Sequence, residues 1–328
     1  MQRRDLGSTG QSVSALGLGC MGMSEFYGAH DDAQSLETLA AALDRGIDFF
    51  DTADMYGAGH NEQLLGSFLA GRPERPIVAT KFGIVREPGK YARRIDNSPD
   101  YVRRACDASM ARLGVERIDL YYCHRRNPEV PIEELIGAMA GLVRAGKVRW
   151  LGLSEVSVDT LRRATAVHPI AAVQSEYSLW TRDPEAGMLE ACRELGTSFV
   201  AYSPLGRALL TGAFGSADDL APDDFRRINP RFQGEALAAN RKLAAALTEF
   251  AAARGATAAQ IALAWPLAKH PHVIPIPGTR RVRYLDENVA AADIVLRVED
   301  IATLDSLFAP GAVQGERYPP EGMKGLQG

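Results

Sequence analysis

Ile47-Asp48-Phe49-Phe50, followed directly by Asp51-Thr52-Ala53-Asp54-Met55-Tyr56, is a short apolar run that ends in polar side chains. A run this short is typical of a buried strand and too short for a helix. Similar runs recur along the chain, and longer amphipathic segments separate them. The predicted strands are 15–18, 47–50, 77–80, 118–123, 148–153, 171–173, 199–201 and 273–276. This alternation predicts β-α units that close a parallel sheet, an α/β fold of the (β/α)8 TIM barrel type.

Helix start and stop signals lie between the predicted strands. Ser98 can cap a helix N-terminus, Pro99 suits its first turn, and Gly114 ends the apolar periodicity that follows. A second helix is expected over 131–145. Both segments therefore support β-α units.

One barrel domain over 1–328 is expected, because barrels of this class commonly reach this length. Residues 1–14 predict a β-hairpin that caps the barrel bottom. Segments 21–30 and 203–234 lack helical periodicity, and long barrel loops usually carry function. We expect 203–234 to contact cofactor and substrate at the C-terminal face. The Gly- and Pro-rich tail, 309–328, is expected to drape over the barrel or to be disordered.

Composition excludes several classes of partner. The net charge of −4 and a pI of about 5.9 leave no basic stripe for nucleic acid. No run of about 18 apolar residues is present, and the chain does not start with an export signal, so a cytoplasmic protein without membrane contact is expected. The cysteines are widely spaced in apolar segments and predict buried free thiols: Cys20, Cys106, Cys123 and Cys192.

Polar side chains follow the predicted strands, where active sites of such barrels are built. Asp51 and Tyr56 follow one strand, Lys81 the next, and His124 another. An adjacent ammonium from Lys81 would stabilise the phenolate of Tyr56, and Asp51 would keep that ammonium charged. His124 would donate a hydrogen bond to a substrate oxygen that gains negative charge. Singly each residue has a structural explanation, but together they predict carbonyl chemistry.

Ordered motifs across nearly the whole chain resemble those of the aldo-keto reductases. They are FFDTADMYG (49–57), ATKFG (79–83), DLYYCHR (119–125), GLSE (152–155), QSEYS (174–178), YSPLGR (202–207) and IPGTRR (276–281). They are most similar to the bacterial and plant branch of perakine-reductase-like and pyridoxal-reductase-like enzymes. The resemblance implies a catalytic tetrad of Asp51, Tyr56, Lys81 and His124, with NADPH-dependent reduction of aldehydes or ketones and Tyr56 as proton donor.

The resemblance also implies where a nicotinamide dinucleotide would bind. Ser154, Glu155 and Gln174 would hold the carboxamide, and Tyr202 would stack on the ring. The pyrophosphate and adenosine residues would be Ser203, Pro204, Leu205, Gly206, Arg207, Gly278, Thr279, Arg280, Arg281, Glu287 and Asn288, with Gly19, Cys20, Met21 and Asp51 completing the site. Guanidinium groups suit a 2′-phosphate, which favours NADPH over NADH, with Arg280, Arg281 and Arg283 as alternative contacts.

Other patterns have simpler interpretations. Gly17-Leu18-Gly19-Cys20-Met21-Gly22 matches a dinucleotide fingerprint, but no helical periodicity follows, so a barrel loop over the cofactor is expected instead. His270 and His272 lack a third ligand, which predicts exposed loop histidines and no metal site.

Substrate contacts and one departure from the family pattern concern the barrel mouth. Met23, Tyr27 and Trp180 are candidates to line a substrate pocket with Tyr56 and His124, or else only to pack the loops. After His124 the chain has Arg125-Arg126-Asn127-Pro128, where members of this branch more often carry an apolar residue and Asp before Pro. We expect this departure to alter loop electrostatics and substrate entry.

Two other functions are compatible with the same residues. A Schiff-base lyase would use Lys81 as a nucleophile, which the neighbouring Asp51 disfavours because it keeps the amine charged. A regulatory, cofactor-binding redox sensor would share the fold, as the potassium-channel beta subunits do, and would bind NADPH without appreciable turnover.

Overall fold

The computed structural model describes residues 1–326 apart from 87–91, 213, 215 and 217–219. Within these residues, parallel strands form an eight-stranded sheet in the order β12-β11-β10-β9-β8-β5-β4-β3. The strands are β3 (Leu18–Gly19), β4 (Phe49–Asp51), β5 (Ile77–Phe82), β8 (Ile118–Cys123), β9 (Val148–Ser154), β10 (Ile170–Glu176), β11 (Ser198–Tyr202) and β12 (Val273–Pro275). Each corresponds to a predicted run.

The sheet closes on itself between its first and last strands. Gly17 N donates to Pro275 O at 2.9 Å, and Gly19 forms a parallel bridge with Gly278. A Cβ at Gly19 would lie 2.9 Å from the carbonyl oxygen of Ile276, so glycine permits this seam. The predicted (β/α)8 barrel is confirmed.

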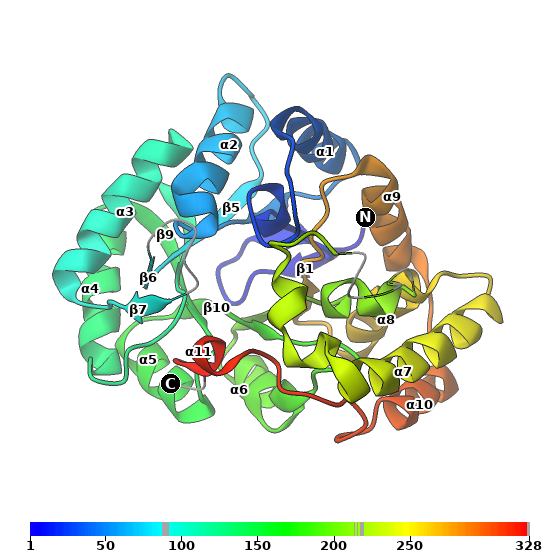
Figure 1. Cartoon of the computed structure of the whole chain (residues 1–328). Helices are drawn as coiled ribbons and strands as arrows, with labels where there is room; N and C mark the ends of the chain where they lie inside the picture. Colours follow the sequence, from blue (N-terminus) through cyan, green and yellow to red (C-terminus); the bar gives the residue numbers. More distant parts are fainter. Residues whose placement is uncertain (87–91, 213, 215, 217–219, 327–328) are drawn as a thin grey trace.

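Helices surround the strands as a ring (Figure 1). They are α1 (Asp32–Asp44), α2 (His60–Leu69), α3 (Pro99–Leu113), α4 (Ile132–Arg144), α5 (Val158–Val167), α6 (Met188–Glu194), α7 (Gly234–Ala252), α8 (Ala258–Lys269), α9 (Val282–Ala290), α10 (Val298–Leu307) and α11 (Pro320–Met323). The predicted signals hold: Ser98 accepts from Tyr101 N, and Gly114 ends α3 with φ +63°. None of the described helices is long and apolar enough to cross a bilayer.

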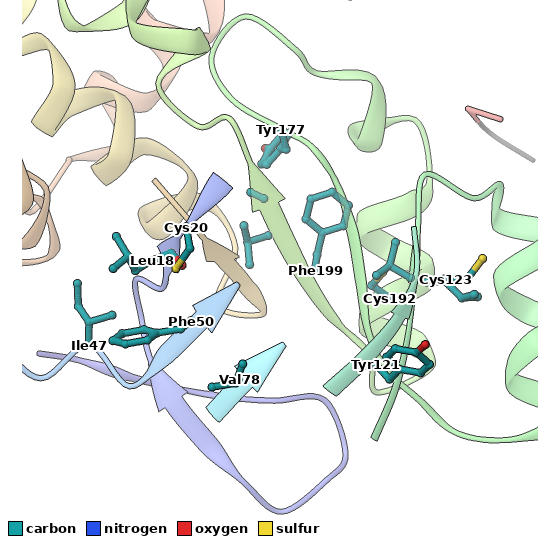
Figure 2. Packing of buried hydrophobic residues seen from close by; sticks show 14 of the residues in the cluster. Leu18, Cys20, Ile47, Phe50, Val78, Tyr121, Cys123, Tyr177, Cys192 and Phe199 are labelled. Carbon is teal, nitrogen blue, oxygen red and sulfur yellow. The ribbon is translucent and has the colours of Figure 1, made fainter. Parts of the chain in front are cut away.

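Side chains alternate between two apolar layers along each strand. Phe50 and Tyr121 belong to the outer layer beneath the helices, part of which Figure 2 shows. Phe49 and Tyr122, one residue away in sequence, belong to the inner layer that fills the barrel. The two-residue period of a strand therefore assigns every second position to the barrel interior.

A β-hairpin closes the bottom of the barrel, as predicted. Strands β1 (Arg3–Asp5) and β2 (Ser12–Ser14) pair antiparallel. Leu6 and Val13 are fully buried in the inner layer. The guanidinium of Arg4 donates to Leu267 O at 2.6 Å and so ties the hairpin to the last turn of α8. The barrel is thus plugged at the end opposite to the strand C-termini.

Several predicted boundaries were wrong by a few residues. The run 77–80 was expected to end its strand, but β5 continues to Phe82, and β10 continues to Glu176 past the predicted end at 173. The apolar run in the sequence stops before the first polar side chain that points into the barrel, Lys81 in β5 and Gln174 in β10. The backbone hydrogen bonding between strands continues past it. A second antiparallel hairpin, β6 (Ile84–Arg86) with β7 (Arg93–Ile95), was not predicted.

The long C-terminal segments are more ordered than the sequence suggested. Segment 203–234, where described, contains the short 3-10 helices η4 (Gly206–Thr211), η6 (Phe225–Ile228) and η7 (Pro230–Phe232). Over 309–326 the tail runs from α10 to α11 (red in Figure 1), and Arg317 and Tyr318 contact residues at the strand ends. Polar anchors hold it where hydrophobic periodicity is lacking.

Candidate active site

The predicted catalytic residues occupy inward-facing positions just beyond core side chains. Asp51 lies two residues after the inner-layer Phe49 in β4, and Lys81 two residues after Ala79 in β5. His124 stands two residues after Tyr122, directly beyond β8. Strand alternation therefore points these groups to one place, the barrel mouth.

Lys81 connects three members of the predicted tetrad. Its Nζ donates to Asp51 Oδ1, to Thr52 O at 2.8 Å and to Tyr56 Oη at 3.3 Å. Gln174 Nε2 donates to the second carboxylate oxygen, Asp51 Oδ2, at 2.7 Å. Lys81 is fully buried and Asp51 is 3% exposed, so the ion pair is screened from water. Every polar atom of this pair has a partner that fixes its position.

Tyr56 begins the short helix η2 (Tyr56–Gly59), whose backbone places its ring at the mouth. Gly57 and Ala58 both adopt positive φ, at +57° and +53°, and such values in a residue other than glycine cost conformational energy. The Tyr56 ring meets the His124 ring edge-on, with centroids 5.9 Å apart. The four predicted catalytic residues are therefore brought together.

Burial controls the protonation of this cluster. It raises the pKa of Tyr56 well above the ordinary value, and the negative charge of Asp51 raises it further. The expected lowering of the phenol pKa is therefore not found in this form of the protein, because loss of hydration outweighs the opposing charge of Arg125. Burial lowers the pKa of Lys81 and raises that of Asp51, while attraction between their charges opposes both shifts. Tyr56 is held as a phenol.

His124 is kept neutral. Burial lowers its pKa well below the ordinary value, and the nearby Arg125, Lys81, Arg93 and Arg86 lower it further. Its Nδ1 is buried and has no partner among the described residues. A neutral imidazole has one N–H group, which can donate a hydrogen bond to a substrate oxygen.

An apolar cluster surrounds the phenol of Tyr56. Ala53, Met55 and Ile84 are buried with it, and Met21 and Phe26 of the first barrel loop lie against them. Met21, expected at the cofactor, is half-buried in the short helix η1 (Met21–Met23). A carbonyl substrate at Tyr56 would therefore meet an apolar wall from segment 21–30.

The residues predicted to hold the carboxamide lie at the ends of β9 and β10: Ser154 is the last residue of β9, Glu155 follows it, and Gln174 lies near the end of β10. Ser154 Oγ accepts from Arg125 Nη1 at 3.2 Å. Glu155 has φ +56°, and its carboxylate accepts from Tyr202 Oη at 2.8 Å and from both terminal nitrogens of Arg317. The tail thus reaches the strand ends at Glu155.

Tyr202 is also touched by the tail, since its hydroxyl lies 2.9 Å from that of Tyr318. Ser203, directly after it, has φ +50°, and Arg207 has φ +55°. Non-glycine residues with positive φ cluster at functional sites. This turn after β11 is the predicted pyrophosphate segment.

Arg207 is engaged within the protein. Its Nη2 donates to Glu176 Oε2 at 2.8 Å, and Arg231 Nη1 donates to Glu176 Oε1 at 3.1 Å. Burial alone would raise the pKa of Glu176. The charges of the two arginines outweigh burial, so the pKa is lowered. Pro204 and Gly206 are buried and Leu205 is half-buried within the same turn.

The predicted adenosine end lies at the barrel seam and the start of α9. Arg280 donates to Gly22 O at 3.3 Å and to Tyr27 O at 3.1 Å, so it holds segment 21–30 in place. Arg281 is exposed at the N-cap of α9. The remaining predicted contacts lie close by in sequence: Gly278 is exposed, Thr279 and Glu287 are half-buried, and Asn288 is buried.

Three predicted substrate or loop residues have different environments. Met23 is fully buried in the outer core layer. Trp180 is 4% exposed, and its ring meets Phe232 edge-on at 5.9 Å, which favours the loop-packing alternative. Tyr27 is half-buried and contacts the guanidinium of Arg226 at 5.3 Å from the ring centre.

Sequence reasoning missed the contribution of arginines to the mouth. Arg125 was noted only as the end of the motif 119–125 and as part of the run after His124, with no role at the site, yet it is 5% exposed beside Ser154. Arg317 lies in the tail, 162 positions from its partner Glu155. The only signal for Arg125 was its place directly after His124; for Arg317 the sequence offers none.

The histidines outside the mouth have local explanations. His270 and His272, expected to be exposed, are half-buried, and His272 Nε2 lies 3.0 Å from Leu189 O. The prediction failed because the start of β12 packs on α6. His30, Asp32 and His60 place potential ligand atoms within 4.8 Å of one another at the surface, a group that the sequence did not suggest. There His60 Nε2 lies 3.1 Å from Asp32 Oδ2, at hydrogen-bonding distance.

Comparison with known proteins agrees with this geometry. The sequence profile described as "Aldo/keto reductase family" matches residues 15–309. The aldo-keto reductase yakc of Schizosaccharomyces pombe, whose name specifies NADP(+), is 43% identical over 94% of this chain and 92% of its own. A probable aldo-keto reductase of Glycine max is 45% identical over 95% and 90%. The solved glycerol dehydrogenase of Gluconobacter oxydans superposes with a TM-score of 0.86, at 28% identity, over 97% and 98%.

Proposed function

Because the chain belongs to the aldo/keto reductase family, we propose that it reduces aldehydes or ketones to alcohols with NADPH and that Tyr56 supplies the proton. The observation that carries this proposal is the contact of Tyr56 Oη with the buried Lys81–Asp51 ion pair, beside a neutral His124. The name of the S. pombe relative supports NADP(H) as the cofactor.

The residues at the mouth fit a nicotinamide dinucleotide. Ser154 and Gln174, at the ends of β9 and β10, place polar side chains at the mouth. The N-terminus of α9 and the exposed Arg281 offer amide and guanidinium donors suited to a phosphate. Ser154, Gln174 and Tyr202 would hold the nicotinamide end, and Arg280, Arg281, Glu287 and Asn288 the adenosine end. When bound, NADPH supplies the hydride.

The chain's own residues complete the reduction. The carbonyl oxygen, placed between Tyr56 and His124, would accept a hydrogen bond from each as negative charge develops on it. Tyr56 transfers its proton to that oxygen and becomes a phenolate. Lys81, whose Nζ lies 3.3 Å from the phenol oxygen, stabilises this phenolate, and Asp51 and Thr52 O hold the ammonium in place. The ammonium of Lys81 therefore stabilises Tyr56 after the phenol has given up its proton.

The geometry disfavours a Schiff-base lyase. The Nζ of Lys81 is fully buried and donates to three acceptors, so its lone pair is not available to attack a carbonyl carbon. A redox sensor differs from an enzyme in turnover, since it would bind NADPH with a negligible steady-state rate. Titration with NADPH and NADH, followed by addition of 4-nitrobenzaldehyde, methylglyoxal or pyridoxal, separates the two.

The decisive variant is Tyr56→Phe. Loss of the proton donor should lower kcat by about 10²- to 10⁴-fold while the Kd for NADPH stays within a few-fold. Tyr121→Phe is the matched control, because its hydroxyl is buried without a partner among the described residues and its ring stacks on Phe82 in the outer layer. Retention of most of the activity in Tyr56→Phe would exclude Tyr56 as the acid.

A further inference from the structure

Arg125 is a buried cation at the mouth without an acidic partner among the residues that the structure describes. Arg125 directly follows His124 in the sequence, and it is 5% exposed. Its Nη1 donates to His124 O at 2.7 Å and to Ser154 Oγ at 3.2 Å, both uncharged acceptors. Its Nε is buried and has no partner among the described residues. A guanidinium in such a place is normally paired with a carboxylate.

Two acids at the mouth, Glu155 and Asp51, are already engaged by other groups. Glu155 accepts from Tyr202, from the backbone N of Glu176 and from two nitrogens of Arg317. Asp51 accepts from Lys81 and Gln174 at its two oxygens. In the described part of the chain, no carboxylate lies within ion-pair distance of the Arg125 guanidinium.

The surrounding charge at the reacting groups is positive. Arg125, Lys81, Arg93 and Arg86 all disfavour a proton on His124. Lys81 forms an ion pair with Asp51, and Arg86 forms one with Glu25. An anion bound at Arg125 would gain a charge-assisted, bidentate contact in a site that is largely shielded from water.

The position of Arg125 separates it from the predicted phosphate contacts. It stands between the ends of β8 and β9, next to His124 and Ser154. The predicted pyrophosphate and 2′-phosphate residues follow β11 and β12, on another part of the rim. An anionic group at Arg125 would therefore belong to the molecule whose carbonyl lies at Tyr56 and His124.

We propose that Arg125 determines substrate specificity by binding a carboxylate, so that the preferred substrates are aldehydes or ketones that carry a carboxylate group. This deepens the carbonyl reductase function and rests on it. The planar guanidinium fork matches a carboxylate better than a neutral amide or ester would. The conservative change to lysine would keep the charge but lose the fork.

The test compares charged and neutral substrates of one shape. Steady-state rates are measured with NADPH for the 2-, 3- and 4-carboxybenzaldehydes and for the matching formylbenzamides. We expect at least one acid to exceed its amide in kcat/KM by about 10- to 100-fold, the value of a hydrogen bond to a charged group. Arg125→Gln should abolish this ratio mainly through KM of the acid, and Arg125→Lys should restore part of it.

Controls separate specificity from a structural or cofactor role. Arg149→Gln removes a cation at the start of β9, at the opposite end of the barrel, and should leave the ratio unchanged. If Arg125→Gln lowers the rates of acid and amide equally, or weakens NADPH binding instead, the proposal is wrong. If kcat/KM for each amide equals or exceeds that for the matching acid, the proposal is also wrong, whereas the reductase function stands. Absence of turnover with all aldehydes would instead refute the proposed function.

Discussion

His124 shows how burial sets chemistry at the scale of one residue. An exposed imidazole is half-protonated near pH 6.5, and its cationic form would repel the neighbouring arginines. Burial and the charges of Arg125 and Lys81 lower its pKa well below that value. The neutral form therefore persists into acidic solution, and it is the form that donates to a substrate oxygen without repelling Lys81.

This protonation state predicts the acid side of the pH profile. Because the His124 pKa is lowered, kcat/KM for a neutral aldehyde should change less than about twofold between pH 7.5 and pH 6, where an ordinary histidine would titrate. The measurement is an initial-rate series in buffers of constant ionic strength. A fall with a midpoint near pH 6.5 that disappears in His124→Asn would contradict the prediction.

At the scale of elements, close helix contacts position the loop that carries Tyr56. Helix α2 starts directly after that loop and packs on α3. Gly66 lies at this contact: a Cβ there would stand 2.4 Å from Arg112 O at the end of α3. Below it the buried Glu62 accepts from Thr80 Oγ1 at 2.5 Å and from Arg112 Nε at 2.6 Å. Helix packing and a buried ion pair thus fix α2 to the barrel.

Gly66→Ala should destabilise the protein by about 1–3 kcal/mol, although alanine favours helices, because overpacking forces α2 and α3 apart. Gly137→Ala in α4 is the matched control, since no atom lies within 4 Å of its added Cβ. That variant should be more stable by about 0.5–1 kcal/mol. Urea unfolding monitors both. Equal effects of the same sign would show that helix propensity outweighs packing.

At the scale of the whole molecule, stability and chemistry lie at opposite ends of the barrel. The hairpin β1–β2 seals one end with Leu6 and Val13, whereas the polar cluster occupies the strand C-termini. The tail adds contacts at the mouth through Arg317 and Tyr318. Substitutions in the plug should therefore affect folding without affecting the reacting groups.

Leu6→Ala should cost about 2–5 kcal/mol, because a fully buried side chain leaves a cavity in the inner layer. The kcat/KM of the folded variant should stay within about twofold of the unmodified protein. Val295→Ala, at a side chain that is 86% exposed, serves as the control and should change stability by less than about 0.5 kcal/mol. A large loss of activity in folded Leu6→Ala would show that the plug and the mouth are coupled.

The sequence by itself determined the barrel and the residues of the predicted tetrad. Both depend on local order: apolar runs set the strands, and the two-residue period that places Phe49 in the barrel also points Asp51 to its mouth. Only the tertiary structure decided which charges are paired. Arg317 contacts Glu155 across 162 positions, whereas Arg125 contacts only uncharged acceptors within the described part of the chain. Pairing depends on the packing of segments distant in sequence, and side-chain periodicity carries no information about that packing.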